Sequence, residues 1–404
     1  MLPSTFMTSR SVHWWGRWMS RLERHFSDPA RYEQVRANVF TRWMAQRRTR
    51  QLLGLMTGFV QTQVLVACVR LRILDLLSQE PQDLQSLAGR LGLQPTALRC
   101  LLDSAVSIQL LRQDVDERYR VGALAHPVLG HAGIRAMVEH NQLRYRDLAD
   151  PDEFLRNHSH GSKGEMAAYW PYAQEEGAGP ALGPQAQVQS QRYSDLMDAS
   201  QNFVIAEVLD SYNFSNHRCV LDIGCGKGRF AVALAQRLPH LNLQVLDLPH
   251  VMDLTRERLR SCGVLSRTQC FARSFLGEPL PRGADLVTLV RVAHDHSDSV
   301  LGQLLRQIWQ ALPKGGQLLL AEPMALAGGS ASGSKEADPY FHFYMLAMGG
   351  GRLRSPDELT SMLHAAGFDG VRRLPTAMPI HAQALLATKS SVYPGMSDLT
   401  VNVD

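Results

Sequence analysis

The sequence predicts an α/β chain with a C-terminal, doubly wound and mostly parallel sheet, preceded by an N-terminal all-helical domain of the winged-helix type. Three observations lead to this prediction. From residue 218 to residue 389, apolar segments alternate with amphipathic ones, as strands and helices do in a sheet covered on both faces. The first apolar segment ends in a glycine-rich turn at Gly224–Gly228. Upstream, residues 83–121 show two helical segments separated by a turn and followed by a short strand.

The strands expected in the C-terminal sheet are the apolar segments Cys219–Ile223, Leu243–Asp247, Thr268–Phe271, Ala284–Val292, Gln317–Glu322, Val371–Leu374 and Ala384–Thr388. A helix expected at Ser355–Ala366 carries its own start and stop signals. Ser355 is a good N-cap, Glu358 completes a capping box, and Gly367 suits the end of the helix.

In the N-terminal region, a helical stretch at Leu53–Leu77 precedes the helix pair Asp83–Leu91 and Pro95–Leu111, and Arg118–Val121 supplies the closing strand. The second helix of the pair is mostly apolar, with Arg99 and little else that could reach a phosphate or a base edge. The net charge of +4 over 404 residues is also too small to indicate nucleic acid. We therefore expect this domain to pack against protein and expect no nucleic-acid partner.

The chain is expected to divide into five parts. These are a basic arm at residues 1–51, the winged-helix domain at 52–125, a helical connector at 126–212, the α/β domain at 213–390 and a tail at 391–404. The connector contains a glycine- and proline-rich segment at Gly177–Gln189 that we expect to be a loop. The six cysteines form no CxxC pair and no metal-ligand spacing, so we expect reduced thiols in the cytoplasm and no bound metal.

The arm interleaves aromatic and basic side chains, and two interpretations of it stay open. It suits an interfacial helix at an anionic bilayer, or an arm that packs on the protein or on a second subunit. We expect no membrane-spanning helix, because no stretch is predicted to approach the roughly 20 apolar residues that a span requires. The residues concerned are Trp14, Trp15, Trp18 and Phe26 with Arg10, Arg17, Arg21, Arg24, Arg47, Arg48 and Arg50.

The turn after the first strand predicts the type of ligand. A glycine-rich turn between a buried strand and a helix lets a ligand approach the backbone. The third glycine comes one position too early for a dinucleotide fingerprint, which argues against a nicotinamide dehydrogenase. Asp222 stands just before Gly224, where it can face a cationic group, and Asp247 ends the second strand, where it can accept from ribose hydroxyls. An adenosine with a positive charge and no phosphate fits, and S-adenosylmethionine is such a ligand.

At this point the chain resembles a known family, the class I S-adenosylmethionine-dependent O-methyltransferases of the plant caffeate and bacterial type. The motifs shared with that family are Asp222–Gly228, Asp247–Pro249, Arg291–Asp295, Leu312–Gly316 and Glu322. Within it, the chain is most similar to the bacterial carotenoid (demethylspheroidene or hydroxyneurosporene) O-methyltransferases, from about residue 54 to residue 389. The stretches of that likeness are Leu52–Leu77, Arg144–Pro151, Tyr169–Tyr172, Arg192–Met197 and Tyr344–Ser355.

The resemblance implies roles for particular residues. His294 corresponds to the family's general base, with Asp295 beside it and Glu322 able to orient the imidazole. Met197 corresponds to a residue near the reacting sulfur, although it also suits an ordinary helix core. The expected cofactor-binding residues are Asp222, Gly224, Gly226, Gly228, Asp247, Leu248, Ser274 and Phe275.

The resemblance also implies a homodimer through the N-terminal domain and an acyclic hydroxylated carotenoid as acceptor, methylated at a tertiary hydroxyl. Such an acceptor requires an apolar slot, for which the expected residues are Met197, Phe341, Tyr344, Met345 and Met348. Cytoplasmic location, with peripheral contact to the inner photosynthetic membrane, would follow. A tetrapyrrole or phenolic acceptor, and a winged-helix regulator that senses S-adenosylmethionine, remain as alternatives.

Three departures from the family pattern stand out. Some of the carotenoid relatives hold a tyrosine at the position of His294, which suggests that base strength matters less than alignment in this branch. Ser274 occupies a position where many relatives carry an aspartate that accepts from the adenine amino group; a serine accepts without charge assistance. Plant relatives also place a second glutamate just after the glycines at Gly349–Gly351, where this chain has Arg352, Leu353 and Arg354.

Overall fold

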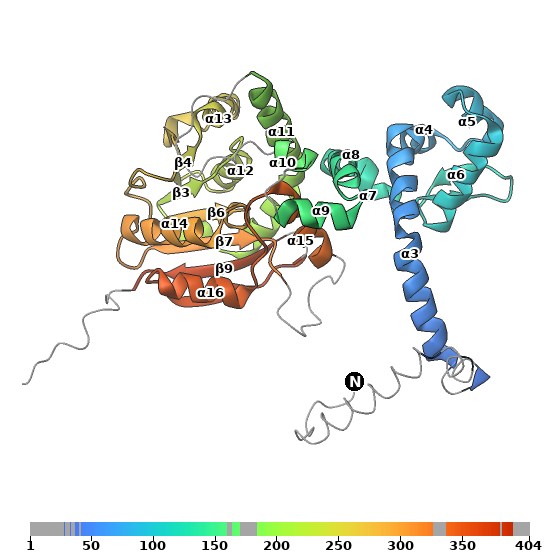
Figure 1. The fold of residues 1–404 in the computed structure, drawn as a ribbon. Helices are drawn as coiled ribbons and strands as arrows, with labels where there is room; N and C mark the ends of the chain where they lie inside the picture. The colour runs from blue at the N-terminus through green and yellow to red at the C-terminus, as the bar shows by residue number, and fades with distance from the viewer. Residues whose placement is uncertain are drawn as a thin grey trace, which may run out of the picture. The chain divides into compact units, whose positions relative to one another are not determined.

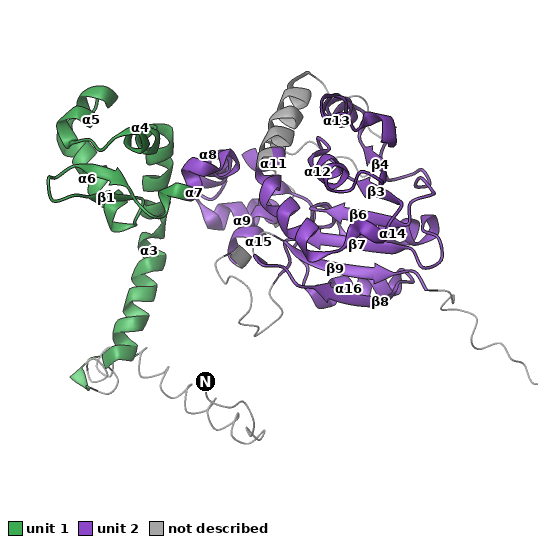
Figure 2. Ribbon diagram, turned by 180° about the vertical axis from the view of Figure 1, so that it is seen from behind, with its two compact units in different colours: residues 1–126 green, residues 127–404 purple. Residues whose placement is uncertain are grey.

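The computed structural model describes residues 28, 33, 37–39, 42–159, 164–169, 184–325, 337–379 and 382–390, with side chains left out at 159, 168–196, 199, 337 and 338. Most of the basic arm, the whole tail and most of the segment Tyr169–Tyr172 lie outside these residues. The chain forms two compact units, residues 1–126 and 127–404 (Figure 2). Each unit is described here by itself, and the five-part division stays a prediction.

Unit 1 contains the helices α3 (Arg42–Arg70), α4 (Ile73–Gln79), α5 (Leu84–Leu91) and α6 (Pro95–Ser107), followed by a two-stranded antiparallel sheet of β1 (Leu111–Gln113) and β2 (Tyr119–Val121). The helix–turn–helix and the closing strand are confirmed. The domain is mostly helical, as predicted, but the helix predicted to reach Leu111 is too long, because α6 ends at Ser107 and Leu111 pairs with Val121. Gln109 breaks the helix by taking a left-handed backbone conformation with φ of 61°.

Helix α3 requires a second correction. Residues 52–69 include no charged side chain, and α3 is the one described helix whose length and composition are sufficient to cross a membrane. Its C-terminal half is buried in unit 1 through Val64, Val66, Cys68 and Val69. Its N-terminal half exposes large apolar side chains, among them Leu55 and Phe59, which are 81% and 70% exposed. A long apolar helix with half of its length uncovered within its own unit is typical of a contact surface.

Unit 2 begins with helices that precede the sheet (Figure 1): α7 (Ala125–Gly130), α8 (Ala132–Asp147), α9 (Pro151–Ser159), α10 (Glu165–Tyr169) and α11 (Pro184–Ser211). The predicted loop Gly177–Gln189 extends too far toward the C-terminus, because α11 already begins at Pro184. Proline is well suited to the first helical turn because its missing N–H would have no partner there.

The sheet of unit 2 has the strand order β5-β4-β3-β6-β7-β9-β8, of which Figure 1 labels β4, β3, β6, β7 and β9. All seven strands fall on the predicted segments. The first five in this order are parallel, while β9 runs antiparallel to both β7 and β8. Their bounds are β3 (Cys219–Ile223), β4 (Asn242–Asp247), β5 (Thr268–Ala272), β6 (Leu286–Val290), β7 (Gln317–Glu322), β8 (Asp369–Leu374) and β9 (Gln383–Thr388).

The connecting helices are α12 (Arg229–Arg237), α13 (Pro249–Ser261), α14 (Asp298–Ala311), α15 (Ala337–Met348) and α16 (Pro356–Ala365), with short 3-10 turns η2 (Phe214–Asn216), η3 (Leu265–Arg267) and η4 (Ala293–Asp295). The capping box predicted for α16 is present, with Ser355 and Glu358 bonding to each other's backbone N–H groups. The mostly parallel α/β prediction is therefore confirmed.

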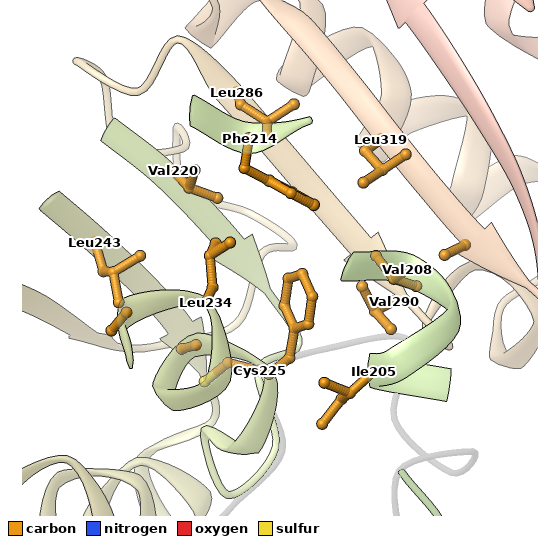
Figure 3. Packing of buried hydrophobic residues seen from close by; sticks show 14 of the residues in the cluster. Ile205, Val208, Phe214, Val220, Cys225, Leu234, Leu243, Leu286, Val290 and Leu319 are labelled. Carbon is orange, nitrogen blue, oxygen red and sulfur yellow. The ribbon is translucent and has the colours of Figure 1, made fainter. Parts of the chain in front are cut away.

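The core consists of two apolar layers, one on each face of the sheet. Neighbouring residues of one strand enter different layers, Val220 joining Phe214 and Phe230 on one face and Leu221 joining Phe368 on the other. Figure 3 shows the first layer, where Ile205 and Val208 of α11 close over the sheet. Because strand order reverses between β3 and β6, a crevice is expected beyond their carboxyl ends.

Candidate active site

The predicted cofactor residues gather where the sheet's strand order reverses. Gly224, Gly226 and Gly228 take left-handed φ values of 67°, 53° and 73°. A Cβ on Gly224 would lie 2.6 Å from Val292 Cγ2, and one on Gly228 would lie 2.8 Å from Thr255 Cγ2. At Gly226 a Cβ would meet nothing within 4 Å, so only the backbone conformation requires glycine there.

Asp247 lies at the end of β4 and fixes the glycine turn. Its carboxylate accepts from Gly226 N and from Leu248 N, both at 2.7 Å. Burial raises the pKa of Asp247 to about 6, and the two N–H groups act in the opposite direction. The same residue's carbonyl accepts from Arg273 N at 2.9 Å, which brings the loop after β5 alongside.

Asp222 is buried at the end of β3 and accepts from Thr288 Oγ1 at 2.8 Å. Burial raises its pKa to about 7, and the nearby Asp247 adds to the rise. A buried carboxyl of this kind has a stronger tendency to ionise when a cation comes beside it. Asp222 and Asp247 are thus two adjacent acceptors beside an open glycine turn.

Ser274 and Phe275 lie in the loop after β5. The Ser274 hydroxyl oxygen accepts from Leu276 N at 3.0 Å, so it shapes the loop. The Phe275 ring meets the His296 ring edge-on, with the centroids 5.1 Å apart. This contact joins the predicted adenine side of the site to the turn that carries His294.

The predicted catalytic residues come together at η4, which carries His294 and Asp295, while Glu322 ends the strand β7. Glu322 Oε1 accepts from Val292 N and Ala293 N at 2.9 and 2.8 Å, and its Oε2 contacts His294 Nδ1. The other imidazole nitrogen, Nε2, lies 3.3 Å from Asp295 Oδ1. The imidazole is thus bracketed by two carboxylates, one at each ring nitrogen.

The electrostatics of this group follow from that bracketing. Burial by itself would lower the pKa of His294, but the carboxylates of Asp295 and Glu322 outweigh it and raise the pKa. Burial also raises the pKa of Asp295. The raised pKa favours the protonated imidazole, and only the neutral imidazole can take up the proton of a bound hydroxyl.

Sequence reasoning missed Arg291 as a site residue, although it opens the Arg291–Asp295 motif. Its backbone is left-handed, with φ of 59°, a conformation that costs energy and clusters at functional sites. The guanidinium donates from Nη1 to Ser200 Oγ at 2.9 Å and approaches Met197 Sδ with Nη2 at 3.2 Å. Met197 is thereby drawn to the catalytic turn.

The predicted acceptor residues lie mainly on α15. Tyr344, Met345 and Met348 are buried in one cluster with Met166, and Met197 packs against it. Phe341 lies outside this cluster and meets the Tyr340 ring edge-on, so its role stays a prediction. The cluster is rich in methionine, a flexible side chain that adapts to apolar ligands.

One buried cation borders this cluster. The Arg144 guanidinium stacks on the Tyr340 ring, 3.8 Å from its centroid, and lies 5.1 Å from that of Tyr344. Beside it, burial lowers the pKa of His140 to about 4, and Arg144 lowers it further. In the described part of the chain, no group of three or more His, Cys, Asp or Glu side chains could hold a metal ion.

Comparison with known proteins places these features in a family. Residues 145–369 match an O-methyltransferase domain and residues 53–129 match an O-methyltransferase dimerisation domain. The demethylspheroidene O-methyltransferase of Cereibacter sphaeroides is 36% identical over 380 residues, covering 94% of this chain and 97% of that protein. The protein of the same name from Rhodobacter capsulatus is 37% identical over 355 residues, covering 86% and 84%.

Solved structures show the same fold. Human N-acetylserotonin methyltransferase in complex with S-adenosylmethionine superposes with a TM-score of 0.68 at 22% identity, covering 85% of this chain and 98% of that one. The pyocyanin biosynthetic protein PhzM superposes with a TM-score of 0.70 at 20% identity, covering 85% and 100%.

Proposed function

The chain belongs to the S-adenosylmethionine-dependent O-methyltransferase family, and from that premise we propose that it converts a tertiary hydroxyl of an acyclic, hydroxylated carotenoid to a methyl ether. The observation that carries the proposal is the position of the buried His294 turn next to a methionine-rich cluster, in a chain similar over nearly its whole length to two demethylspheroidene O-methyltransferases. Acyclic carotenoids are long hydrocarbons, and an apolar cluster with few polar groups suits them.

The methyl donor fits the described residues. The open space at Gly226 lets a ligand approach the backbone, Asp222 can face a positive charge, and Asp247 can accept from ribose hydroxyls. Leu248, Ser274 and Phe275 would border the adenosine. When bound, S-adenosylmethionine supplies an activated methyl group whose transfer leaves a neutral thioether.

The chain's own residues then have two tasks. The first is alignment, because in-line transfer requires the acceptor oxygen, the methyl carbon and the sulfur to lie on one line. We assign this task to the cluster around Met345 and Met348. The second is removal of the hydroxyl proton, for which His294 and Asp295 present the Nε2 atom and a carboxylate side by side, while Glu322 holds the other ring nitrogen.

A panel of acceptors tests the substrate class. Purified protein and methyl-labelled S-adenosylmethionine are incubated with a detergent-dispersed hydroxylated acyclic carotenoid, a catechol and a bacteriochlorophyllide, each alone and in competition. We expect label in the carotenoid with the highest kcat/KM. Preference for the catechol or the tetrapyrrole would keep the methyltransferase and discard the carotenoid. Cofactor binding without any transfer, together with a gel shift on DNA at moderate salt, would favour the regulator.

We also propose peripheral contact with the membrane in which such an acceptor dissolves. The tryptophans and arginines of residues 1–48 suit an anionic surface. The protein would then work at the cytoplasmic side of the inner membrane. Deleting residues 1–48 is expected to reduce co-sedimentation with anionic liposomes, whereas equal sedimentation of both forms would contradict the contact.

A further inference from the structure

One buried arginine, Arg354, holds the main chain on both sides of the His294–Asp295 pair. Its Nη1 donates to Ala293 O at 2.9 Å, and its Nη2 donates to His296 O at 2.7 Å. Its Nε donates to Asp298 Oδ1 at 2.8 Å. The side chain is 1% exposed, so water does not compete for these bonds. A charge-assisted fork of this geometry fixes two carbonyl groups at once.

The main chain next to Arg354 contacts the same turn. Arg352 N donates to His294 O at 2.9 Å. Gly351 has φ of 70°, and a Cβ on it would lie 1.9 Å from His294 O, so the two backbones are in direct contact. Arg354 O in turn accepts from Ala325 N at 3.0 Å, close after Glu322 in the chain. The turn that carries His294 is therefore held from Glu322 on one side and from the 351–354 segment on the other.

The same segment continues directly from the acceptor cluster. Helix α15 contributes Tyr344, Met345 and Met348 to that cluster and ends at Met348. Only residues 349–353 separate this helix from Arg354, and Gly349 N bonds back to Leu346 O at 3.1 Å. The wall of the acceptor cluster and the clamp on the catalytic turn are thus one short, continuous piece of chain.

We propose that Arg354 is a positioning residue of the transfer reaction, which sets the place of the His294–Asp295 turn relative to the acceptor lying against α15. Arg354 lies in the segment where the plant relatives place a second glutamate. The turn is fixed here by a cation that binds its carbonyl groups. The proposal rests on the proposed function only in requiring a hydroxyl acceptor, and it holds whichever acceptor the protein uses.

Three substitutions test it: Arg354→Met, Arg354→Lys and Arg354→Ala. Because a displacement of about 1 Å can cost on the order of 10²-fold in rate, Arg354→Met is expected to lower kcat by about 10- to 10²-fold. Cofactor Kd and acceptor KM should stay close to those of the wild type. Arg354→Lys keeps the charge but loses the fork, so it should retain intermediate kcat. Added guanidinium should restore part of the turnover of Arg354→Ala.

The control is Arg373→Met, which removes a surface ion pair with Asp357 of α16 and touches no part of the turn. Its kcat should equal that of the wild type. A merely structural role predicts instead that turnover, cofactor affinity and melting temperature of Arg354→Met fall together and that guanidinium restores nothing. That result, or unchanged kcat in Arg354→Met, would overturn the proposal.

An acceptor-free measurement separates this proposal from the proposed function. In ¹⁵N-histidine-labelled protein, the His294 ring signals are assigned by their loss in His294→Gln. Arg354→Met should shift these signals and their titration, whereas Arg373→Met should leave them in place. If the wild type methylates no carotenoid, the proposed function fails, while a shift of the His294 signals in Arg354→Met still supports the positioning role. Unchanged His294 signals in Arg354→Met would overturn that role as well.

Discussion

At the scale of single residues, Glu322 holds the turn that carries His294. One carboxylate oxygen accepts two backbone N–H groups and the other meets the His294 ring. It is 1% exposed, so no water could replace a lost partner. An amide at this position would offer only one acceptor and would turn an NH₂ group toward groups that themselves donate.

Glu322→Gln is therefore expected to lower kcat by about 10²- to 10⁴-fold, the range over which positioned proton transfer contributes. Cofactor affinity, measured separately by calorimetry, should change little. Glu207→Gln is a matched control, since Glu207 also accepts a backbone N–H, from Met378 at 3.0 Å, away from the turn. Wild-type turnover in Glu322→Gln would contradict the assigned role.

Cofactor affinity should depend on pH through Asp247 and Asp222. Burial raises the pKa of Asp247 to about 6 and that of Asp222 to about 7. If both carboxyls contact the bound cofactor as ionised acceptors, the cofactor lowers their pKa and its affinity rises with pH through these values. We expect the Kd for S-adenosylmethionine to weaken as pH falls from 8 to about 5. Affinity that is flat with pH, or stronger at low pH, would show that neither group acts as an ionised acceptor.

The residues that sequence could predict are those at strand ends. Asp247 and Glu322 each end a strand and Asp222 lies one residue before the end of another, and the carboxyl ends of parallel strands meet at one edge of a sheet. The sequence did not indicate Arg291 and Arg354 as candidate site residues. Arg291 contacts a hydroxyl and a methionine sulfur, and Arg354 donates to main-chain carbonyls. Those contacts depend on a left-handed residue and on a distant loop, which no local pattern indicates.

At the scale of elements, the segment between α15 and α16 packs directly against the turn that carries His294. Gly351 allows this segment to touch the His294 carbonyl. Strand and helix positions in this region follow from apolar periodicity and capping signals, and these were predictable. The end of α6 could not be predicted, because Gln109 adopts an unusual left-handed conformation. The start of α11 could not be predicted either, because a proline begins this helix within a segment whose composition is typical of a loop.

Gly351→Ala is expected to lower kcat by at least about 10-fold, because a displaced turn loses the alignment that transfer requires. It should also lower the melting temperature, since alanine resists a positive φ. Gly302→Ala in α14 is the matched control: its Cβ would meet nothing closer than 3.6 Å, and it should keep both activity and stability. Equal activity of the two variants would argue against close contact between the segment and the turn.

At the scale of the whole molecule, the match to a dimerisation domain leads us to expect that a second copy of the chain covers the exposed half of α3. The match at residues 53–129 begins within that half. Residues such as Leu55, Met56 and Phe59 are exposed in the single chain, and a second copy that covers them would remove an apolar surface from water. This surface could be found in the sequence, but only the fold shows that its own unit leaves it uncovered.

Leu55→Glu combined with Phe59→Glu should therefore shift the protein from dimer toward monomer in light scattering after size-exclusion chromatography. Val115→Glu is the control, because Val115 is 99% exposed on the wing between β1 and β2 and should leave the dimer intact. If the double variant dimerises as strongly as the wild type, the dimer interface lies elsewhere in the chain.

We propose that the protein methylates a tertiary hydroxyl of an apolar acceptor and that His294 takes up the hydroxyl proton. The most direct test is to identify the product that the wild-type protein forms from deuteromethyl-labelled S-adenosylmethionine and a hydroxylated acyclic carotenoid, by mass spectrometry and NMR. We expect one labelled methyl group on the former hydroxyl oxygen, in an ether that is stable to mild base. Label on any other atom, or an unlabelled carotenoid beside a phenol that is methylated in the same mixture, would contradict it.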